Sequence, residues 1–490
     1  MFSTAIPAPC APQSRSARRL SALLALGFLA GCGGGDAPAP PAPKVNQAPT
    51  VTSGSSVSVV ENVAGSIYQA TGSDPEGSPL SFSISGGADA ARFSITSGGQ
   101  LSFVTPPNFD RPADIDDNNI YQVEIAASDG QDRGTLFLTV TVSNSKEGVS
   151  TRRVGTSFVN PAAASPVNDT IVLVAEKNGA IYSFNPQNGG KQLLFQIPSV
   201  SGHGVLAVLA RPDFAATGRF FVMYTNNGFL VVNEYLRNPA GPTVPNNFGP
   251  LLQVEAPQYS GGGWLGFAPD GNLLIATGDA GGYGDPSGSA QNDSSRLGKL
   301  IRGSPNPDPF AGATANFYVL NTVAKGLHRP VGGFVYPGGL LIEDRGQSIA
   351  DEVNLFSIGT NGANFGWPFK EGMQLIQGNP PANLLDPVIS YGRPGGVPVL
   401  GTVGGAVAGN GVASIGGHYV FADRSGAIFS LPTATLQNGI TLTLSAVERR
   451  TADFAPDSGL IDEPVAVVAD SAGRVYLLDA DGEIFRVDAG

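Results

Sequence analysis

Apolar and polar residues alternate along four segments between residues 48 and 145. The segments SVSVV, LSFSIS, YQVEIAAS and TLFLTVTVS place apolar side chains at about every second position. A period of two is typical of β-strands that bury one face. Such strands, separated by polar loops, predict a small β-sandwich of about 100 residues.

A different pattern recurs between residues 150 and 490. Each copy consists of a short apolar strand, a turn containing glycine, a second apolar strand and a polar loop. The copies are DTIVLVAEKNGAIYSFNPQNG, GWLGFAPDGNLLIATGDAGG, GGFVYPGGLLIEDRGQ, GGHYVFADRSGAIFSL and AVVADSAGRVYLLDADGEIFRVD. Hairpins that cannot bury both faces must pack on one another, and radial packing gives a β-propeller. The length suits six to eight four-stranded blades, with the last copy closing the ring against residues near 155.

Composition agrees with an all-β fold and narrows the possible partners. Charged residues make up 14% of the chain, which contains 66 glycines and 39 prolines. This balance disfavours long helices. The net charge of −12 argues against nucleic acid, because phosphate backbones are bound by clustered Lys and Arg. The same charge suits a secreted surface with sites for hard cations.

The first residues resemble a bacterial targeting segment. A basic region with three arginines precedes the apolar run LSALLALGFLAG, which is too short to span a bilayer comfortably. The run ends in Leu29-Ala30-Gly31-Cys32, which is similar to a lipobox, whose cysteine is diacylated and becomes the new N-terminus. Residues 1–31 are therefore expected to be a lipoprotein signal peptide and Cys32 the lipid anchor. The alternatives are an ordinary signal peptide and an N-terminal helix that happens to end in cysteine.

The segment 32–47 is rich in Gly, Pro and Ala and is predicted to form an extended tether. The protein is then expected in the bacterial cell envelope, anchored to the outer membrane and facing the periplasm or the surface. Cys10 and Cys32 are the only cysteines. The mature fold is therefore predicted to contain no disulfide, no thiolate metal site and no cysteine nucleophile.

Acidic residues gather in the loops of the predicted sandwich, residues 48–145. The loops VVENVAG, GSDPEGSPL, NFDRPADIDDNN and AASDG resemble those of bacterial cadherin-like repeats over essentially the whole unit. The resemblance implies Ca²⁺, which takes six to eight oxygen ligands, bound by Glu61, Asp74, Glu76, Asp110 and Asp129. The following segment 143–146, SNSK, departs from the acidic linker of that family. The alternative is that these acids solvate loops and cap turns.

Loops of the predicted propeller, residues 150–490, resemble in order those of the glucose/sorbosone dehydrogenase family. The match runs along most of residues 165–490 and includes QYSGGGWLGFAPDG, AKGLHRP, EDRGQSIADEVNLF, GANFGWPFKEG and GGHYVFADRSG. Members of that family are six-bladed propellers that oxidise aldoses or similar alcohols with pyrroloquinoline quinone (PQQ) and Ca²⁺. They pass the electrons to a quinone or haem acceptor. The resemblance therefore implies a six-bladed propeller with the parts of a sugar dehydrogenase.

The glycine run Gly261–Gly263 precedes a predicted strand, and such a run usually frames a side chain that does chemistry. At the preceding position the family carries the histidine that removes the sugar hydroxyl proton. This chain has Ser260 there. A serine at its ordinary pKa cannot accept a proton near neutrality without a partner base. The sequence thus predicts that the family's base has been lost.

Two further histidines lie near the implied site. Where the family reads GLRNP, this chain reads Gly326-Leu327-His328-Arg329-Pro330. His328 is a candidate base, or it lines the pocket, while Arg329 keeps a positive charge for the quinone. His203 lies where the family has a glutamate, and it is expected to face the axis.

Other motifs of the family are retained more fully. The turn EDRGQ resembles the one whose backbone carbonyls hold Ca²⁺ beneath the quinone, which implies that Gly346 and Gln347 bind metal and cofactor. Asp351 and Glu352 match a structural Ca²⁺ site of some members. Asp423 and Arg424 match a late loop in which a cation meets a quinone carboxylate. The alternative for Arg424 is a salt bridge at a blade edge.

Two classes of function remain open from the sequence. One is a dehydrogenase that oxidises a sugar or alcohol through PQQ and Ca²⁺. The other is a propeller without catalysis that binds a sugar or a protein, with the cadherin-like unit as a spacer or calcium-binding module. A surface adhesin is a third interpretation and rests on the cadherin-like unit alone.

Overall fold

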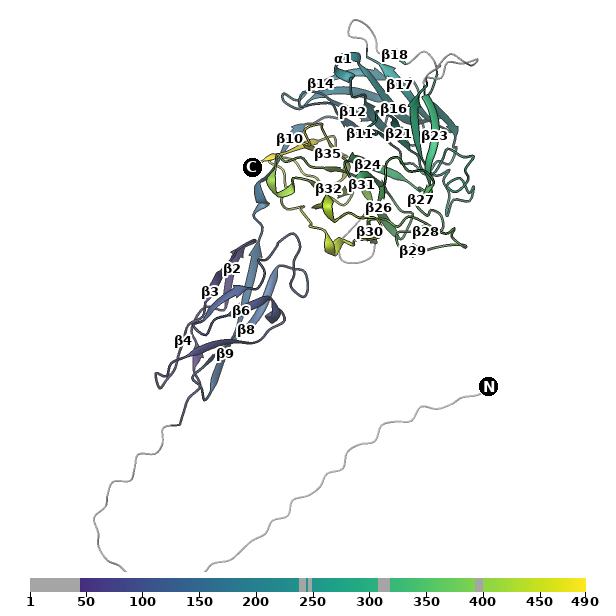
Figure 1. The fold of residues 1–490 in the computed structure, drawn as a ribbon. Helices are drawn as coiled ribbons and strands as arrows, with labels where there is room; N and C mark the ends of the chain where they lie inside the picture. The colour runs from purple at the N-terminus through teal and green to yellow at the C-terminus, as the bar shows by residue number, and fades with distance from the viewer. Residues whose placement is uncertain (1–44, 238–243, 246–248, 307–317, 393–399) are drawn as a thin grey trace, which may run out of the picture. The chain divides into compact units, whose positions relative to one another are not determined.

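The computed structural model describes residues 45–237, 244–245, 249–306, 318–392 and 400–490 (Figure 1). This part of the chain is almost entirely β-structure, and its one α-helix is the short α1, Phe214–Thr217. The predicted all-β fold is confirmed. The expected signal peptide 1–31 and Cys32 lie outside the described residues, as does most of the tether 32–47. Among the residues that are described, no helix is long and apolar enough to cross a membrane.

Residues 50–143 form a small unit of antiparallel and parallel strands around its own core. Its larger sheet has the order β2 (Ser56–Val60), β9 (Arg133–Ser143), β8 (Ile120–Ser128) and β5 (Ser81–Gly86). The smaller sheet joins β3 (Ser66–Gln69), β7 (Gln100–Phe103) and β6 (Phe93–Ile95), and β1 (Thr50–Val51) pairs with β4 (Gly72–Ser73). Leu101, Val123, Ile125 and Val140 are completely buried between the strands. All four alternating segments of the sequence are strands.

Six sheets follow within the described residues, and each is one blade of a propeller. The first blade consists of β11 (Pro161–Pro166), β12 (Val172–Glu176), β13 (Ala180–Asn185) and β14 (Gly190–Gln196). The second consists of β15 (Val205–Ala210), β16 (Arg219–Asn226), β17 (Phe229–Leu236), β18 (Val244–Pro245) and β19 (Leu252–Glu255). The third consists of β20 (Trp264–Phe267), β21 (Leu273–Ala276), β22 (Lys299–Pro305), β23 (Tyr318–Lys325) and β27 (Ala363–Asn364).

The remaining three blades complete the ring. The fourth blade consists of β24 (Pro330–Tyr336), β25 (Gly339–Asp344), β26 (Ala350–Phe356) and β30 (Ile389–Gly392). The fifth consists of β31 (Thr402–Val407), β32 (His418–Asp423) and β33 (Ile428–Pro432). The sixth consists of β34 (Pro464–Ala469), β35 (Val475–Asp479), β36 (Ile484–Ala489) and β10 (Val149–Gly155). A separate short hairpin pairs β28 (Lys370–Glu371) with β29 (Gln374–Leu375).

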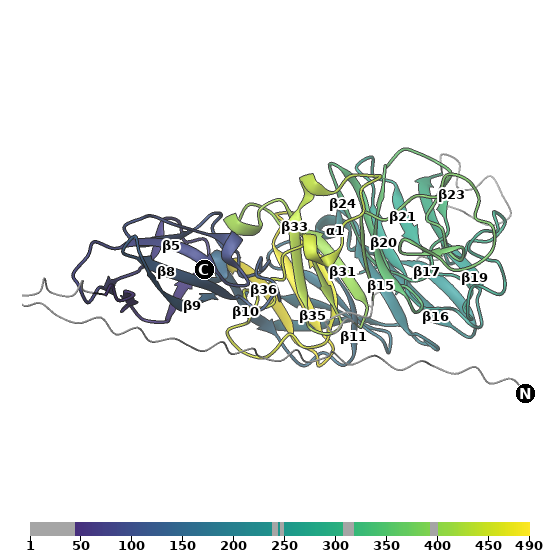
Figure 2. The same cartoon turned by 90° about the horizontal axis from the view of Figure 1, so that it is seen from below.

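The ring closes by joining the two ends of the propeller sequence. Strand β10 pairs antiparallel with β36, so that Val149 lies opposite Ala489 and Arg152 opposite Arg486. The inner strands contact one another in the order β11, β15, β20, β24, β31, β34 and back to β11, and several of them are seen along the middle of the propeller in Figure 2. They enclose an apolar channel of about 250 Å³.

The repeated hairpins of the sequence do not all occupy the same place in a blade. The copy that begins at Gly263 forms the first and second strands, β20 and β21, and the copy at Gly332 likewise forms β24 and β25. The copies at Asp169 and Gly416 form the second and third strands instead. The shared pattern therefore reflects the hairpin as a unit, and it does not mark the start of a blade.

One hydrogen-bonding arrangement is repeated in five of the six blades described. A side chain at the end of the second strand accepts a backbone N–H from the loop that leads into the innermost strand of the same blade. The pairs are Glu176 with Val159 N (2.8 Å), Thr225 with His203 N (3.0 Å), Asp344 with His328 N and Arg329 N (2.9 and 2.6 Å), Asp423 with Leu400 N and Gly401 N (2.7 and 2.8 Å), and Asp479 with Glu463 N (3.1 Å). We refer to Glu176, Thr225, Asp344, Asp423 and Asp479 as the acceptor ring.

The third blade differs from this arrangement. Thr277, at the equivalent position, donates to Arg296 O and accepts from Lys299 N within its own blade. The loop before β20 is held instead by Tyr259, whose hydroxyl accepts a hydrogen bond from Gly278 N at 2.7 Å. The acceptor ring therefore fixes the loops that surround the axis, and the third blade uses a tyrosine for the same purpose.

We expect Asp423→Ala to reduce the free energy of unfolding by about 2–4 kcal/mol, because Leu400 N and Gly401 N would lose their acceptor in a buried place. Asp423→Asn keeps one acceptor oxygen and should lose less. Urea denaturation at pH 7 measures both variants. Equal losses for the two substitutions would contradict a role as backbone acceptor.

Glu343 provides a pH-dependent test of the packing between the fourth and fifth blades. Burial raises its pKa to about 7, although hydrogen bonds from Thr402 and Tyr419 act in the opposite direction. The side chain is completely buried. Because its folded-state pKa lies above the unfolded value of about 4.5, its contribution to stability is present below pH 4.5 and is lost as the pH rises through 7.

We therefore expect wild-type stability to fall relative to Glu343→Gln between pH 5 and pH 9, by an amount of the order of 3 kcal/mol. The melting temperatures of both proteins across this range measure the difference. A difference that stays constant with pH would show that Glu343 does not titrate as described.

Candidate functional site

The loops that lead into the inner strands line a pocket of about 610 Å³ at one end of the axis. Polar and charged residues from all six blades described line it: Asn160, Lys177, His203, Ser260, Arg329, Arg345, Arg424, Glu463 and Asp481. Many of these residues adjoin the acceptor ring, either in the loop that it binds or directly after it in sequence. The ring thus positions the pocket's side chains through their backbones.

The charges of the pocket are unequal. Lys177, Arg345 and Arg424 each follow directly after a member of the acceptor ring, and Arg329 is the fourth cation. Glu463 and Asp481 are the only carboxylates among the lining residues described, and Glu463 already pairs with Arg424. The pocket therefore carries an excess of positive charge, which suits an anionic ligand.

Arg345 is held in place by the fifth blade. Its Nε donates to Thr402 O at 3.0 Å, which holds the guanidinium against the loop of the fifth blade. Burial lowers its pKa to about 10, and the neighbouring Arg329 and Arg424 act in the same direction. A group with this pKa keeps its charge at neutral pH.

Each glycine of the run Gly261–Gly263 leaves room for a side chain from another blade. A Cβ on Gly261 would lie 3.2 Å from Nδ1 of His203, and one on Gly262 would lie 2.8 Å from Cγ of Arg329. A Cβ on Gly263 would lie 2.3 Å from Sδ of Met223. All three glycines also have a positive φ, which side chains disfavour. The run therefore accommodates residues brought to it from the second and fourth blades.

Ser260 lines the pocket together with Arg329, but its hydroxyl is directed at the backbone. Oγ lies 3.0 Å from His328 O, 3.2 Å from Gly261 O and 3.3 Å from Asp279 O. These are all carbonyl acceptors, so the hydroxyl donates and holds two loops together. The predicted loss of the family's base at this position stays a prediction.

His328 does not line the axial pocket. It is buried beside Trp367, with ring centroids 4.3 Å apart, and its Nδ1 donates to Arg345 O at 2.7 Å. Burial lowers its pKa, while Asp279 opposes the shift. His328 lines a separate cavity of about 10 Å³, which also includes Asp344, Gly346, Glu352 and Glu371.

The turn predicted to hold Ca²⁺ lies beside this small cavity. Gly346 N donates to Asp351 Oδ1 at 2.9 Å, and Gln347 contacts Gly284 N through its side chain. Neither Gly346 nor Gln347 is among the residues that line the axial pocket. Burial raises the pKa of Glu352 to about 8. Of these four predicted ligands, Gly346 and Glu352 thus line the small cavity, and Asp351 accepts the Gly346 N–H beside it.

Asp423, predicted to contact the cofactor, belongs to the acceptor ring. It is completely buried, and both its carboxylate oxygens accept backbone N–H groups. The next residue, Arg424, is the one that lines the pocket. The structure thus separates the pair: Asp423 fixes the loop, and Arg424 faces the ligand space.

The acids of the sandwich fall into two sets. Asp74 accepts Glu76 N and Ser78 N, and Asp129 accepts Gln131 N and Asp132 N, as in ordinary loop turns. Glu76 accepts the side-chain amide of Gln47 at 3.0 Å. The hydrogen bonds of Asp74 and Asp129 fit the interpretation in which the acids cap turns.

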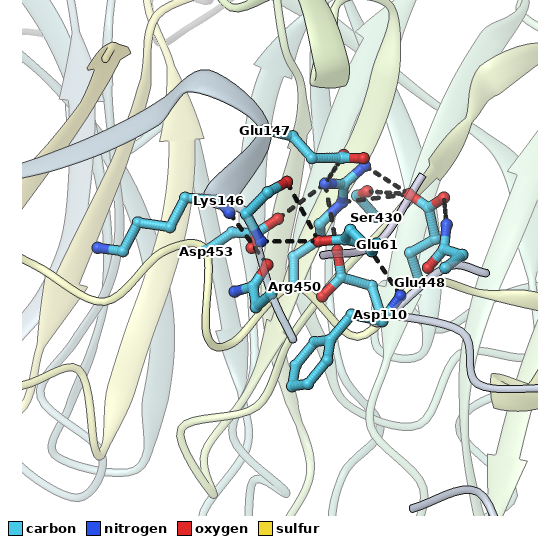
Figure 3. A network of polar contacts seen from close by, with 12 residues as sticks. Glu61, Asp110, Lys146, Glu147, Ser430, Glu448, Arg450 and Asp453 are labelled. Carbon is cyan, nitrogen blue, oxygen red and sulfur yellow. Dashed lines mark hydrogen bonds and ion pairs between the residues drawn. The ribbon is translucent and has the colours of Figure 1, made fainter. Parts of the chain in front are cut away.

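Glu61 and Asp110 of the sandwich lie beside residues 448–453, a segment that follows the fifth blade and bridges to its strand β33 (Figure 3). Asp110, Glu147 and Asp453 present oxygens within 4.8 Å of one another, the one such group found among the described residues. Arg450 lies at their centre: its guanidinium is 3.2 Å from Asp110 and 2.7 Å from Asp453, and it also pairs with Glu147 and Glu448. A guanidinium thus occupies the point on which the acids converge.

Burial raises the pKa of Asp110 to about 8, with Asp453 acting in the same direction and Arg450 opposing it. Glu61 accepts Phe109 N at 2.8 Å and Ser145 N at 3.0 Å, which fixes the loop and the linker beside the cluster. One cation therefore faces several carboxylates, and the arrangement serves as an ion-pair joint between two parts of the chain.

A local pattern in the sequence marks the pocket cations, and the family resemblance did not use it. Lys177 and Arg345 were not predicted as site residues, yet the segments AEKNG, EDRG and ADRSG each place a cation one residue after an acid at the end of an apolar strand. The three segments are equivalent because each ends the second strand of its blade, β12, β25 or β32.

The fold and this cavity define a six-bladed β-propeller whose loops converge on one cationic pocket. Residues 158–384, which belong to the propeller, match the Glucose / Sorbosone dehydrogenase family.

Quinoprotein glucose dehydrogenase B of Acinetobacter calcoaceticus is 24% identical over 253 residues, covering 44% of this chain and 51% of that protein. The HIPL1 protein of Arabidopsis thaliana is 25% identical over 317 residues, covering 50% and 44%. The chain thus spans about half the length of these curated relatives. The PQQ-bound aldose sugar dehydrogenase of Streptomyces coelicolor has the same fold, with a TM-score of 0.53, 19% identity, and coverage of 70% of this chain and 99% of that one.

We expect Arg450→Met to lower the free energy of unfolding by about 3–5 kcal/mol, because it leaves Asp110 and Asp453 buried without their cation. The exposed neighbour Arg449 provides a matched control, and Arg449→Met should change stability little. Urea denaturation measures both.

The same variants test calcium at this joint. Added Ca²⁺ should raise the melting temperature of Arg450→Met, in which the carboxylates are free to bind it, and should leave the wild type unchanged. A clear rise for the wild type would show that metal, and not the arginine, is the resident cation.

Proposed function

We propose that this protein is a dehydrogenase of sugars that uses PQQ held in the axial pocket. The observation that carries the proposal is the pocket itself: four cations converge on a cavity of about 610 Å³ at the axis of a propeller with a glucose/sorbosone dehydrogenase domain. The solved relative from Streptomyces coelicolor binds PQQ on the same fold, which supports the choice of cofactor.

The residues of the pocket fit such a group by their chemistry. PQQ is a planar molecule with three carboxylates, and guanidinium groups bind carboxylates with paired hydrogen bonds. Lys177, Arg329, Arg345 and Arg424 would hold these carboxylates. When bound, the quinone takes up two electrons, as hydride, from the alcohol carbon of the sugar.

The sugar would enter through a second cavity of about 320 Å³ that adjoins the pocket. Asn160, Lys177 and His203 line both cavities, so a sugar could reach the cofactor while its remaining hydroxyls contact the first and second blades. Electrons would pass to an external quinone or haem acceptor.

We also propose that the protein binds Ca²⁺ at two sites. The small cavity beside His328 is large enough for one ion or water, and Asp344, Glu352 and Glu371 offer the oxygen atoms that Ca²⁺ prefers. These carboxylates also accept backbone N–H groups. The second calcium site would be formed by the acids of the sandwich, which would then act as a cadherin-like calcium-binding spacer. Cys32 would be the lipid anchor that holds the protein in the cell envelope.

The alternative is a propeller that binds a sugar or protein without catalysis. Ser260 at the family's base position favours it, because the serine hydroxyl donates to carbonyls and offers no base. Binding of the cofactor followed by measurement of turnover separates the two.

We expect the full-length protein to bind PQQ and to reduce a redox dye with aldoses, with weaker binding as ionic strength rises. Lys177→Met and Arg424→Met should each raise the Kd for PQQ about tenfold or more, since each removes a charge-assisted contact. Titration calorimetry with and without Ca²⁺ measures the affinities.

Arg302→Met is the control, because Arg302 pairs with Asp270 on the third blade and does not line the pocket. The proposal would be abandoned if PQQ did not bind under any of these conditions. Binding without dye reduction by any aldose would favour the non-catalytic alternative.

A further inference from the structure

The three histidines of the chain lie in three different surroundings. His328 is buried beside the small cavity, and His418 lies 3.3 Å from Ser430 Oγ in the fifth blade. His203 is the one that lines the axial pocket. We propose that His203 is the general base that removes the hydroxyl proton of the sugar, in place of the histidine that the family carries at the position of Ser260. The inference rests on the proposed function.

The hydrogen bond of the His203 ring determines which nitrogen can act. Nε2 lies 2.8 Å from Tyr259 O. A carbonyl oxygen only accepts, so Nε2 carries the hydrogen and Nδ1 of the neutral ring keeps its lone pair. Among the described residues, no protein group makes a hydrogen bond to Nδ1 of His203. The nitrogen able to accept a proton is thus the one left for a ligand.

The acceptor that selects this tautomer is itself fixed. Tyr259 is buried, and its hydroxyl donates to Gly262 O at 3.2 Å and accepts from Gly278 N at 2.7 Å. The backbone of His203 is held from the other side by Thr225, a member of the acceptor ring. Ring and backbone are therefore oriented independently, as a general base requires.

The ring lies beside the position at which the family has its base. A Cβ on Gly261 would be 3.1 Å from Cε1 and 3.2 Å from Nδ1 of His203, so the imidazole covers the residue next to Ser260. Ser260 itself directs its hydroxyl at His328 O. The imidazole of His203, from the second blade, thus lies beside the part of the third blade where the family carries its histidine base.

Solvent and charge around His203 suit proton transfer. The residue is exposed and lies between the two adjoining cavities, so an accepted proton can leave to water. The charged groups that line the pocket with it are Lys177, Arg329, Arg345, Arg424, Glu463 and Asp481. Glu463 is paired with Arg424, and Asp481 accepts the backbone N–H of Glu483 at 3.3 Å, which leaves Asp481 as the competing base.

In the proposed step, Nδ1 of His203 takes the proton from the C1 hydroxyl of the sugar. The electron pair of the broken O–H bond would form the C1=O bond of the lactone, while the hydrogen on C1 would leave with its electron pair to a bound quinone, the two-electron oxidant of the sugar. The imidazolium then releases its proton to solvent.

The test compares His203→Gln, His203→Ala and Asp481→Asn with the wild type and with the control His418→Gln, which lies outside the pocket. We expect His203→Gln to lower kcat about 10²–10⁴-fold while the Kd for PQQ, measured by calorimetry, changes less than about threefold. The acid limb of the pH–rate profile should disappear, and added imidazole should restore part of the activity of His203→Ala. Acylation by diethyl pyrocarbonate, mapped by mass spectrometry in the wild type, should modify His203 and be blocked by bound PQQ and sugar.

An active wild type with unchanged kcat and pH profile in His203→Gln would overturn this inference alone, as would loss of the acid limb in Asp481→Asn instead. A wild type that neither binds PQQ nor reduces the dye would overturn the proposed function, and this inference with it. His203→Gln that fails to bind PQQ would reassign the residue to cofactor binding.

Discussion

Backbone N–H groups that approach a propeller axis have no neighbouring strand to accept their hydrogen bonds. In this fold the acceptor ring supplies that acceptor, with one side chain at the end of the second strand of five blades. A buried N–H without a partner is costly, so each ring member also determines where the following loop lies. The pocket depends on this constraint: the loops held by the ring contribute Asn160, His203, Arg329 and Glu463, and the residues directly after it contribute Lys177, Arg345 and Arg424.

The repeat of an acid followed by a cation explains how one motif serves both stability and binding. The acid points back into its blade to accept backbone N–H groups, and the next side chain, on the opposite side of the strand end, faces the axis. Asp423 and Arg424 show this division within one dipeptide. Substituting the two members of such a pair should therefore have separable effects on folding and on ligand binding.

Local patterns were sufficient to predict the strands but not the contacts between blades. The alternation in 48–145 and the hairpins of 150–490 are confirmed as strands, because periodicity reports burial within one element. The glycine run Gly261–Gly263 predicts a functional side chain at position 260. Its actual neighbours, His203 and Arg329, come from loops more than fifty residues away in either direction, and no local pattern carries that information. Arg450 at the sandwich acids is a contact across more than 300 residues and could not be inferred from spacing.

Ring closure by β10 and β36 has a consequence for the order in which the protein is made. Strand β10 leaves the ribosome early, directly after the sandwich, whereas its partner β36 follows only after the strands of the other five blades. Throughout synthesis and any export, β10 is an unpaired strand edge, and such edges associate readily with other strands. The sandwich can fold while the propeller is still incomplete. Pairing of β36 with β10 then completes the sixth blade and, with it, the axial pocket.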